Sequence, residues 1–570
     1  MLGLLINTWK SHKNLLCVLA IFIFSEILIN PIGDFPLNDD WAYGKTIQTF
    51  MLEGVVSSSE WGEAFFLTQM VWGLLFCKIF GFSFTVLRFS QIIMGIVGVI
   101  IFYNILIRLS KSTSLVSHAT CMLLFNPVVF QQLNTFQTDI PFAVFSLISF
   151  YCLFRYVQDS RWYNYIVGVL FALFAILIKQ TGIAIAITYC LCYVLFSPKR
   201  YVDYFTSFIT TCLLIMVVPV YQHLSELSGG LPASNGFMSS VLFNTIASPD
   251  FHDLMRIGYY IINTSLSFGL FVAPFTLVCF MEYRKKAPYL FNNLMPLSII
   301  CILGLLIIAV KTYYSGNYLP FSGNIIYDIG LGPIIMTGID QNILPNVPKL
   351  GIIMWLIISF IGFLGFMSMI YLILSLSGMI YSNSYPEYRM LRFTAIYSIV
   401  FSIIYITPFL VVNANIRYTN VILPYIILFV VVAIEFFRKN NIFLRKANYR
   451  NIKLLLAPII IFGIVGTHDY LSFQRGRWKA LNHLTRNESI PIDMIDGGFE
   501  FNEWHYSEKY DVWDMTDDIK KKGRFWPVVD DKYIVTVIDI DGYDLHKEFK
   551  YRRWLPFGDY SINVLKKSTE

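Results

Sequence analysis

The chain has 570 residues, of which 56% are hydrophobic and only 14% are charged, and its mean hydropathy is +0.59. Soluble globular chains carry about a quarter charged residues, so this composition excludes a soluble protein and indicates an integral membrane protein. The formal net charge is +6, and no nucleic-acid partner is expected.

Long apolar runs recur along the chain. A helix of about 20 apolar residues crosses the ~30 Å hydrocarbon core of a bilayer. These runs are too long and too uniformly apolar for the alternating strands of a membrane barrel. We therefore predict an α-helical polytopic membrane protein whose transmembrane part is residues 1–467. The thirteen predicted spans are residues 14–30, 85–107, 113–130, 139–155, 163–178, 182–197, 203–223, 258–281, 292–312, 350–374, 393–412, 421–437 and 453–467.

The first loop, residues 31–84, contains an acidic pair and a further apolar stretch. In "LNDDWAYGK" the adjacent Asp39 and Asp40 closely follow the first span. They are either the solvated end of a loop or a reactive pair held at the membrane surface. The stretch "EAFFLTQMVWGLLFCKIFGF" is apolar enough to span, but counting it as a span would reverse the charge asymmetry downstream. We therefore expect interfacial helices in this loop.

Basic residues fix the predicted orientation. An odd number of spans places the two termini on opposite sides of the membrane. Alternate loops, starting from the N-terminus, collect basic clusters such as Arg284, Lys285 and Lys286. Because cytoplasmic loops carry an excess of Lys and Arg, we predict a multi-pass protein of the plasma (inner) membrane with a cytoplasmic N-terminus and an extracytoplasmic C-terminus.

Residues 468–570 differ in character from the rest of the chain. Their 16 Lys and Arg and 19 Asp and Glu residues resemble the surface of a soluble domain. The segments "KYIVTVIDID" and "YSINVLKK" are typical of strands, whereas "YLSFQRGRWKALNHLTR" is typical of a helix. We predict a small α/β extracytoplasmic C-terminal domain.

Four charged residues stand at the predicted outer ends of spans. A charge inside or beside the bilayer is costly and usually functional. Asp139 begins the fourth span, and the alternative is a carboxylate that only satisfies a helix N-terminus. Arg88, Lys179 and Arg417 oppose the positive-inside trend, and they could together seat a membrane-bound phosphate. The alternative for each cation is snorkelling to ordinary headgroups.

These residues permit group transfer at the outer face, with a carboxylate as general base. The sequence contains no Gly-rich phosphate loop, Ser-His-Asp arrangement or HExxH, so cytosolic nucleotide chemistry and proteolysis have no support. No cofactor is expected. A carboxylate pair can bind a divalent cation, but no further ligands stand at metal-binding spacing, so we predict no metal site.

Five motifs, in order, resemble those of the GT-C class of membrane glycosyltransferases, in the group of the protein O-mannosyltransferases and the aminoarabinose transferase of lipid A modification. They are "LNDDWAYGK", "FGFSFTVLRFSQ", "TDIPFAVFSLISF", "FALFAILIKQTGI" and "IRYTNVILP". The chain departs from the family in having Phe-Leu-Thr-Gln at 66–69 in place of His-Pro-Pro, and Gln-Thr-Gly after Lys179 in place of Gly-Pro.

The resemblance implies a GT-C fold and inverting transfer of a hexosyl or pentosyl group from a polyprenyl-phosphate donor to a lipid, glycan or protein acceptor. It implies catalytic roles for Asp39, which would be the catalytic carboxylate, and for Asp40 and Asp139, which would support acceptor or sugar binding. It implies lipid-phosphate binding by Lys179, Arg417, Arg88 and Tyr418.

Two other functions remain open from the sequence. A transporter or flippase of lipid-linked saccharides would place polar residues near the middle of the bilayer, whereas the ionisable residues here gather at the outer ends of spans. A membrane scaffold would leave Asp39, Lys179 and Arg417 unexplained. The transferase makes a further geometric prediction: these three residues and Asp139 should line one outward cavity.

Overall fold

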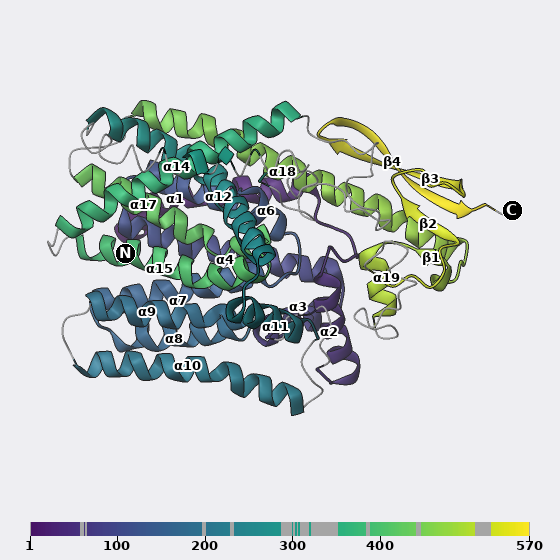
Figure 1. The fold of residues 1–570 in the computed structure, drawn as a ribbon, viewed down its shortest axis with the longest axis horizontal. Helices are drawn as coiled ribbons and strands as arrows, with labels where there is room; N and C mark the ends of the chain where they lie inside the picture. The colour runs from purple at the N-terminus through teal and green to yellow at the C-terminus, as the bar shows by residue number, and fades with distance from the viewer. Residues whose placement is uncertain are drawn as a thin grey trace.

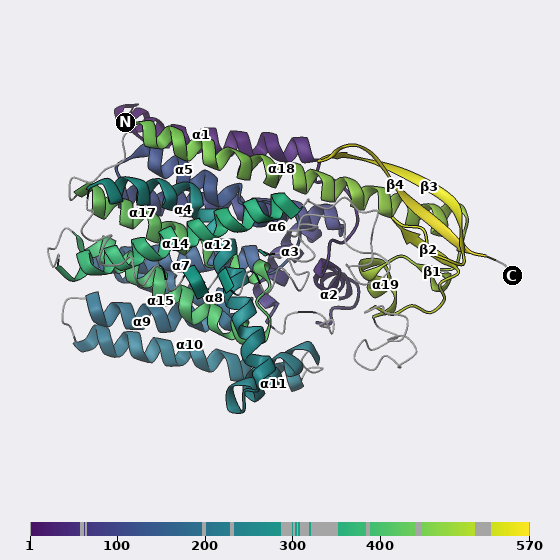
Figure 2. The same cartoon turned by 45° about the horizontal axis from the view of Figure 1, so that its top comes forward.

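A bundle of long helices lies beside a small sheet in the computed structural model (Figure 1). The sheet and the C-terminus lie at one end of the bundle, and the N-terminus lies at the other, as both views show (Figures 1 and 2). We call these the sheet end and the N-terminal end. The structure describes residues 2–56, 62, 65–196, 201–227, 233–286, 299, 302–304, 306–307, 310, 319–320, 352–382, 388–439, 446–507 and 526–568.

Eight of the described helices contain segments long and apolar enough to cross a membrane. They are α1 (Leu2–Ile29), α4 (Phe84–Leu109), α7 (Asp139–Asp159), α10 (Tyr201–Leu227), α12 (Phe251–Lys286), α14 (Ile352–Ser382), α15 (Arg389–Val412) and α18 (Lys446–Asn482). The chain is thus a polytopic helical membrane protein, as its composition predicts.

Shorter helices complete the bundle. Four of them lie within or close to predicted spans: α5 (Thr113–Leu124), α8 (Trp162–Ile176), α9 (Ile183–Phe196) and α17 (Leu423–Lys439). The other short helices are α2 (Asp40–Glu53), α3 (Leu67–Phe80), α6 (Pro127–Gln132), α11 (Ala233–Ala247) and α16 (Ile416–Thr419). Of these, α2 and α3 lie toward the sheet end (Figure 1). At 14 residues, α3 is shorter than the ~20 residues that a perpendicular span needs.

The predicted spans and the helices differ in two places. The predicted span 113–130 is not one helix, because it breaks into α5 and α6 at Asn126. The Asn126 side chain accepts hydrogen bonds from the amides of Val128 and Val129, and Pro127 is the first residue of α6. Side-chain capping and a first-turn proline both favour a new helix start. The predicted span 292–312 lies mostly outside the described residues.

The sheet at the C-terminus has four strands in the order β1-β2-β4-β3. β1 (Ile495–Asp496) pairs parallel with β2 (Tyr533–Thr536), while β4 (Phe557–Lys567) pairs antiparallel with both β2 and β3 (Tyr543–Trp554). One further helix, α19 (Phe499–Tyr506), follows β1. The structure thus has the small α/β unit expected from the sequence.

The bundle and the sheet are joined by one continuous helix. The predicted helix beginning at Tyr470 is the last part of α18, which starts at Lys446. The predicted domain boundary at 467 therefore falls inside a helix. Since α18 packs against β3 as well as against α1, α6 and α12, it is a direct structural link between the two parts.

Close backbone approach holds α12 against α14. A Cβ atom added at Gly269 would lie 2.0 Å from the carbonyl oxygen of Gly362, and one at Gly365 would lie 2.0 Å from that of Gly269. Small residues at a membrane-helix interface allow this kind of contact. These glycines are therefore required for the tight pairing of the two helices.

Candidate functional site

An ion pair joins the first loop to the short helix α16, which carries Arg417. Arg417 Nη1 lies 2.6 Å from Asp39 Oδ2, although the two residues are 378 positions apart. The Asp39 side chain is 19% exposed, so its carboxylate is partly open to a ligand. The pair is therefore both fixed in position and accessible.

A second ion pair lies beside the first and is more deeply buried. Lys179 Nζ lies 2.8 Å from Asp139 Oδ1, and the two side chains are 3% and 1% exposed. Arg417 Nε lies 3.7 Å from Asp139 Oδ2. The four groups thus form one network, which we call the charge cluster: Asp39, Asp139, Lys179 and Arg417.

Tyr418 packs against both cations. Its ring centroid lies 4.8 Å from Lys179 Nζ and 4.9 Å from the Arg417 guanidinium carbon. Its hydroxyl accepts a hydrogen bond of 3.0 Å from Arg417 Nη2, and its ring stacks on Phe409 at 5.0 Å. Cation–π contacts of this kind stabilise a desolvated charge, so Tyr418 helps to hold the two cations together.

Local backbone features place the cations. The side chain of Asn415 caps α16 by accepting a hydrogen bond of 3.0 Å from the Arg417 amide. Helix α8 ends at Ile176, and Lys179 is extended before a short turn ending at Gly182. A Cβ atom at Gly182 would lie 2.8 Å from the Ile176 amide nitrogen. The turn after Lys179 therefore needs glycine at this position.

Asp40 lies next to Asp39 but does not join the charge cluster. Its carboxylate is buried and accepts hydrogen bonds from the amides of Leu37 and Phe136. Burial raises the pKa of the Asp40 carboxyl to about 8, while Arg88 and these two amide donors oppose the rise. In this structure Asp40 connects the first loop to the segment before Asp139.

Arg88 also lies outside the charge cluster. Its guanidinium donates hydrogen bonds to the carbonyl oxygens of Pro31, Gly33 and Phe35 in the first loop, and to that of Asn134. These contacts engage all three guanidinium nitrogens, and the side chain is buried. In this structure Arg88 holds the first loop in place, and its expected contact with a lipid phosphate stays a prediction.

The charge cluster has the chemistry of an anion site with an adjacent base. Arg417 Nε is buried and finds no hydrogen-bond partner among the described residues. Guanidinium and ammonium donors suit a phosphate group, and the more exposed carboxylate, Asp39, is the one that a substrate could reach. Asp139 is instead closed in by Lys179 and Arg417.

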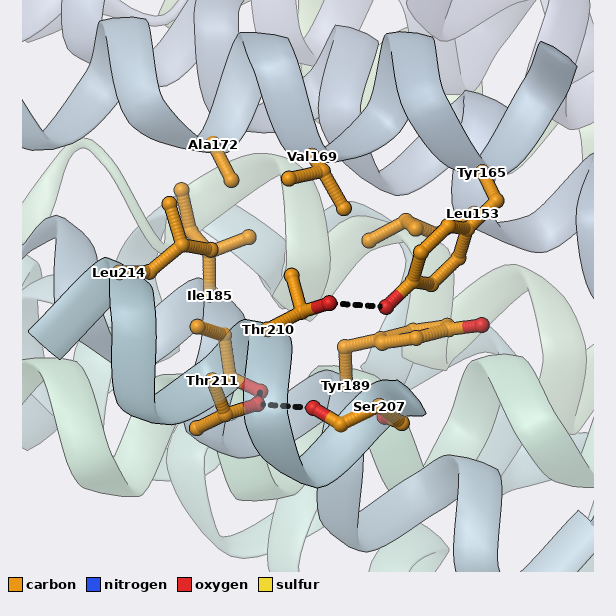
Figure 3. Close-up of a pocket in the computed structure, with 11 residues that line it drawn as sticks. Leu153, Tyr165, Val169, Ala172, Ile185, Tyr189, Ser207, Thr210, Thr211 and Leu214 are labelled. Carbon is orange, nitrogen blue, oxygen red and sulfur yellow. Dashed lines mark hydrogen bonds between the residues drawn. The ribbon is translucent and has the colours of Figure 1, made fainter. Parts of the chain in front are cut away.

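A small cavity lies elsewhere in the bundle. It has a volume of about 10 Å³, and its lining comes from α7, α8, α9 and α10 (Figure 3). The hydroxyl of Tyr165 donates a hydrogen bond of 2.7 Å to Thr210 at its edge. None of its lining residues belongs to the charge cluster. The prediction that the cluster lines an outward cavity stays a prediction.

All four residues of the charge cluster are candidate site residues from the sequence, whereas the residues that support them are not. Within the parts of the chain that the structure describes, no three His, Cys, Asp or Glu side chains gather as metal ligands. The supporting residues Asn415 and Gly182 were not anticipated. Asn at the start of a helix is a recognisable capping signal, but the close contact at Gly182 depends on how α8 ends.

Comparison with known proteins gives one family match. Residues 71–224 match the family model described as dolichyl-phosphate-mannose-protein mannosyltransferase, and this segment includes Arg88, Asp139 and Lys179. No curated protein sequence matches the chain.

Two solved structures of ArnT from Cupriavidus metallidurans align over almost the whole chain. The apo structure has 11% identity over 96% of this chain and 97% of that chain, with a TM-score of 0.37. The structure bound to undecaprenyl phosphate has 12% identity over 97% and 98%, with a TM-score of 0.38. TM-scores this low do not by themselves establish a common fold.

The family match covers three of the five sequence motifs, from the span that begins near Arg88 to the span that ends before Lys179. The described helices and the small terminal sheet agree with the helical membrane part and the α/β domain expected from the sequence. The matched segment therefore carries three of the motifs that resemble the GT-C class of membrane glycosyltransferases.

Proposed function

We propose that the chain transfers a sugar from a polyprenyl-phosphate donor to a hydroxyl-bearing lipid, glycan or protein acceptor, with inversion at the anomeric carbon. The observation that carries the proposal is the position of Arg417, which is 2.6 Å from Asp39 and 3.7 Å from Asp139. One cation thus contacts both the partly exposed carboxylate of Asp39 and the buried carboxylate of Asp139.

In the proposed reaction the donor phosphate binds Arg417 and Lys179, with Tyr418 packed against both. An arriving phosphate competes with Asp39 for the Arg417 guanidinium. The Asp39 carboxylate then gains the freedom to accept a proton from the acceptor hydroxyl. Donor binding would therefore both fill the site and release the Asp39 carboxylate from its ion pair with Arg417.

The chemical step is a single displacement. The acceptor oxygen forms a bond to the anomeric carbon, the bond from that carbon to the phosphate oxygen breaks, and the acceptor proton passes to Asp39. The leaving polyprenyl phosphate gains one negative charge. Arg417 and Lys179 would stabilise that charge more strongly in the transition state than in the ground state, which is the requirement for faster chemistry.

We place the site at the extracytoplasmic face. The support is the asymmetry of Lys and Arg between the loops and the place of α2, which begins directly after Asp39, toward the sheet end (Figure 1). A reporter fused after the C-terminal domain, active only outside the cytoplasm, tests this orientation. A signal from the cytoplasmic side would reverse it.

The activity is tested with purified protein and a panel of polyprenyl-phosphate sugars, each with a hydroxyl-bearing acceptor. The expected result is acceptor-dependent release of polyprenyl phosphate from at least one donor. A flippase would move the intact donor between leaflets without breaking the sugar–phosphate bond. Movement without any release, across the whole panel, would therefore replace the transferase with the transporter.

A further inference from the structure

The residue before Asp39 is held by the C-terminal part of the chain. The amide of Asn38 donates a hydrogen bond of 3.0 Å to Glu500 Oε1, across 462 positions of sequence. Asn38 has a φ of 54°, a left-handed conformation that residues other than glycine rarely adopt. The backbone entering Asp39 is therefore in an unusual conformation with a distant charged partner.

Glu500 is itself fixed by a buried cation. Arg477 Nη1 lies 2.6 Å from Glu500 Oε2, and both side chains are 0% exposed. Arg477 also donates through Nε to the carbonyl oxygen of Gly497 at 3.1 Å. Since Arg477 belongs to α18 and Glu500 to α19, the carboxylate is held between the linking helix and the turn after β1.

Further contacts hold α19 against α2. The rings of Trp41 and Phe499 meet edge to face at 6.2 Å, and Trp526 belongs to the same buried cluster. Lys45 Nζ donates hydrogen bonds of 3.2 Å to the Trp504 carbonyl oxygen and to Ser507 Oγ. Helix α2, which begins directly after Asp39, is thus attached to the C-terminal domain at several points.

A buried ion pair is weak grounds for stability, because desolvation offsets much of the attraction between its charges. A pair that also binds the backbone next to a reactive side chain has a second possible role, since misplacing a reactive group by about 1 Å can cost about 100-fold in rate. By holding the backbone at Asn38, Glu500 can orient the side chain of Asp39, the next residue.

We propose that Glu500, oriented by Arg477, is a positioning residue for Asp39, so that the C-terminal domain completes the active site. This inference rests on the proposed function of Asp39. The C-terminal domain would then contribute to the transferase through one carboxylate, that of Glu500, which accepts a hydrogen bond from the Asn38 amide.

The test separates the hydrogen-bond acceptor from the buried charge. Removing Glu500 alone would strand the Arg477 charge, and the protein could fail to fold. Two double variants avoid this: Arg477→Met with Glu500→Gln keeps an oxygen that can accept from the Asn38 amide, and Arg477→Met with Glu500→Leu does not. The two variants differ at position 500 alone, where Gln offers an acceptor oxygen and Leu offers none.

The matched control is Asp469→Asn. Asp469 lies on α18 and accepts hydrogen bonds of 2.7 and 2.9 Å from the amides of Trp554 and Leu555 at the β3–β4 turn. This variant perturbs the C-terminal domain at a place where no contact to Asn38 is involved.

We expect the Leu variant to lower kcat at least about tenfold relative to the Gln variant, with the donor KM within about twofold. Amide hydrogen exchange in the peptide spanning residues 37–44 should be faster in the Leu variant than in the Gln variant. Asp469→Asn should leave both kcat per folded molecule and this exchange near their wild-type values.

Each failure has its own signature. Equal kcat and equal exchange in the two double variants, in an enzyme that turns over donor, would overturn the positioning role and leave the transferase standing. An exchange difference in a protein that turns over no donor would refute the proposed function but not the contact. A loss of kcat in Asp469→Asn as large as that in the Leu variant would show that any disturbance of the domain suffices.

Discussion

The two ends of the helical bundle use acidic residues in different ways. At the N-terminal end, Glu435 of α17 pairs with Arg438 at 2.8 Å, only three positions along the same helix. The Glu435 carboxylate also accepts a hydrogen bond from Ser110. At the sheet end, Asp39 and Asp139 pair with cations that are 378 and 40 positions away in sequence.

The Glu435–Arg438 pair is local to one helix, whereas the pairs of the charge cluster join segments that are far apart in sequence. Residues three apart on a helix face each other, so the Glu435–Arg438 pair follows from helix geometry alone. The Arg438 side chain is 37% exposed and can reach water. The charge cluster requires four segments to meet at a buried place, where an unneeded charge would be costly. We therefore expect the Glu435–Arg438 pair to contribute to stability and the charge cluster to contribute to chemistry.

Replacing one carboxylate at each end gives the largest expected contrast. Asp39→Asn keeps the shape of the side chain and removes the base, so kcat should fall by roughly 10²–10⁴-fold. Glu435→Gln should leave kcat per folded molecule within about twofold, because that group is distant from the cluster in the fold. Turnover is measured as release of polyprenyl phosphate, and folding by thermal unfolding of the purified proteins.

A wild-type rate in Asp39→Asn would remove Asp39 from the mechanism. A fall in Glu435→Gln equal to that in Asp39→Asn would show that the two ends are not separable. The adjacent variant Asp40→Asn sharpens the assignment: its side chain is bonded to backbone amides, so we expect its main effect on unfolding temperature.

The cations give the second contrast. Arg417→Lys keeps the charge but loses the forked donors that suit a phosphate, so the donor KM should rise by about tenfold or more. Arg438→Lys, at the other end of the bundle, should change the KM by less than about twofold, because its carboxylate partner is local and the Arg438 side chain is itself partly exposed. An unchanged KM in Arg417→Lys would argue against direct contact with the donor phosphate.

The sequence anticipated the charge cluster because its members are chemically out of place. Lys179 and Arg417 interrupt apolar surroundings on the side where basic residues are scarce, and this can be seen without coordinates. The sequence alone could not separate Asp39 from Asp40, since both are acidic and adjacent. Only the fold shows that Asp40 accepts hydrogen bonds from the amides of Leu37 and Phe136, whereas Asp39 pairs with Arg417.

Arg88 shows the opposite case. By position it resembles the other two cations at the ends of spans, but the carbonyl oxygens that bind it belong to residues 31, 33, 35 and 134. Backbone carbonyls are present at every position, so no sequence pattern marks them as partners. The helix break at Asn126, in contrast, coincides with an Asn-Pro pair, which is a signal for a helix start but lies inside an apolar run long enough to indicate a span.

A smaller effect is expected at Tyr418. Tyr418→Phe keeps the ring against both cations and removes the hydroxyl that accepts from Arg417 Nη2. One such hydrogen bond contributes about 0.5–1.5 kcal/mol, or roughly 2- to 12-fold, and we expect the loss in kcat/KM to fall in that range. Tyr418→Leu, which also removes the ring, should cost more. If both variants lose the same amount, the ring contributes nothing.

The smallest effect concerns acid and the docking of α19. Burial, with a contribution from Lys45, lowers the pKa of His505 from 6.5 to about 4. Between these values the unfolded chain binds more protons than the folded one, so folding stability is complete above pH 6.5 and falls as the pH drops toward 4. His505 lies on the helix that carries Glu500, and its ring packs 4.7 Å from that of Phe501.

We expect His505→Gln to reduce the drop in unfolding temperature between about pH 7.5 and about pH 5, while changing little at the higher pH. Comparison with the wild type at both pH values separates the effect of protonating His505 from the effect of the substitution itself, because the substitution is present at both pH values. If the sheet end is the part of the molecule that acid loosens first, exchange in residues 37–44 should rise at low pH in the wild type more than in His505→Gln. Equal responses in the two proteins would place the acid-sensitive group elsewhere and break the link between α19 and the loop of Asp39.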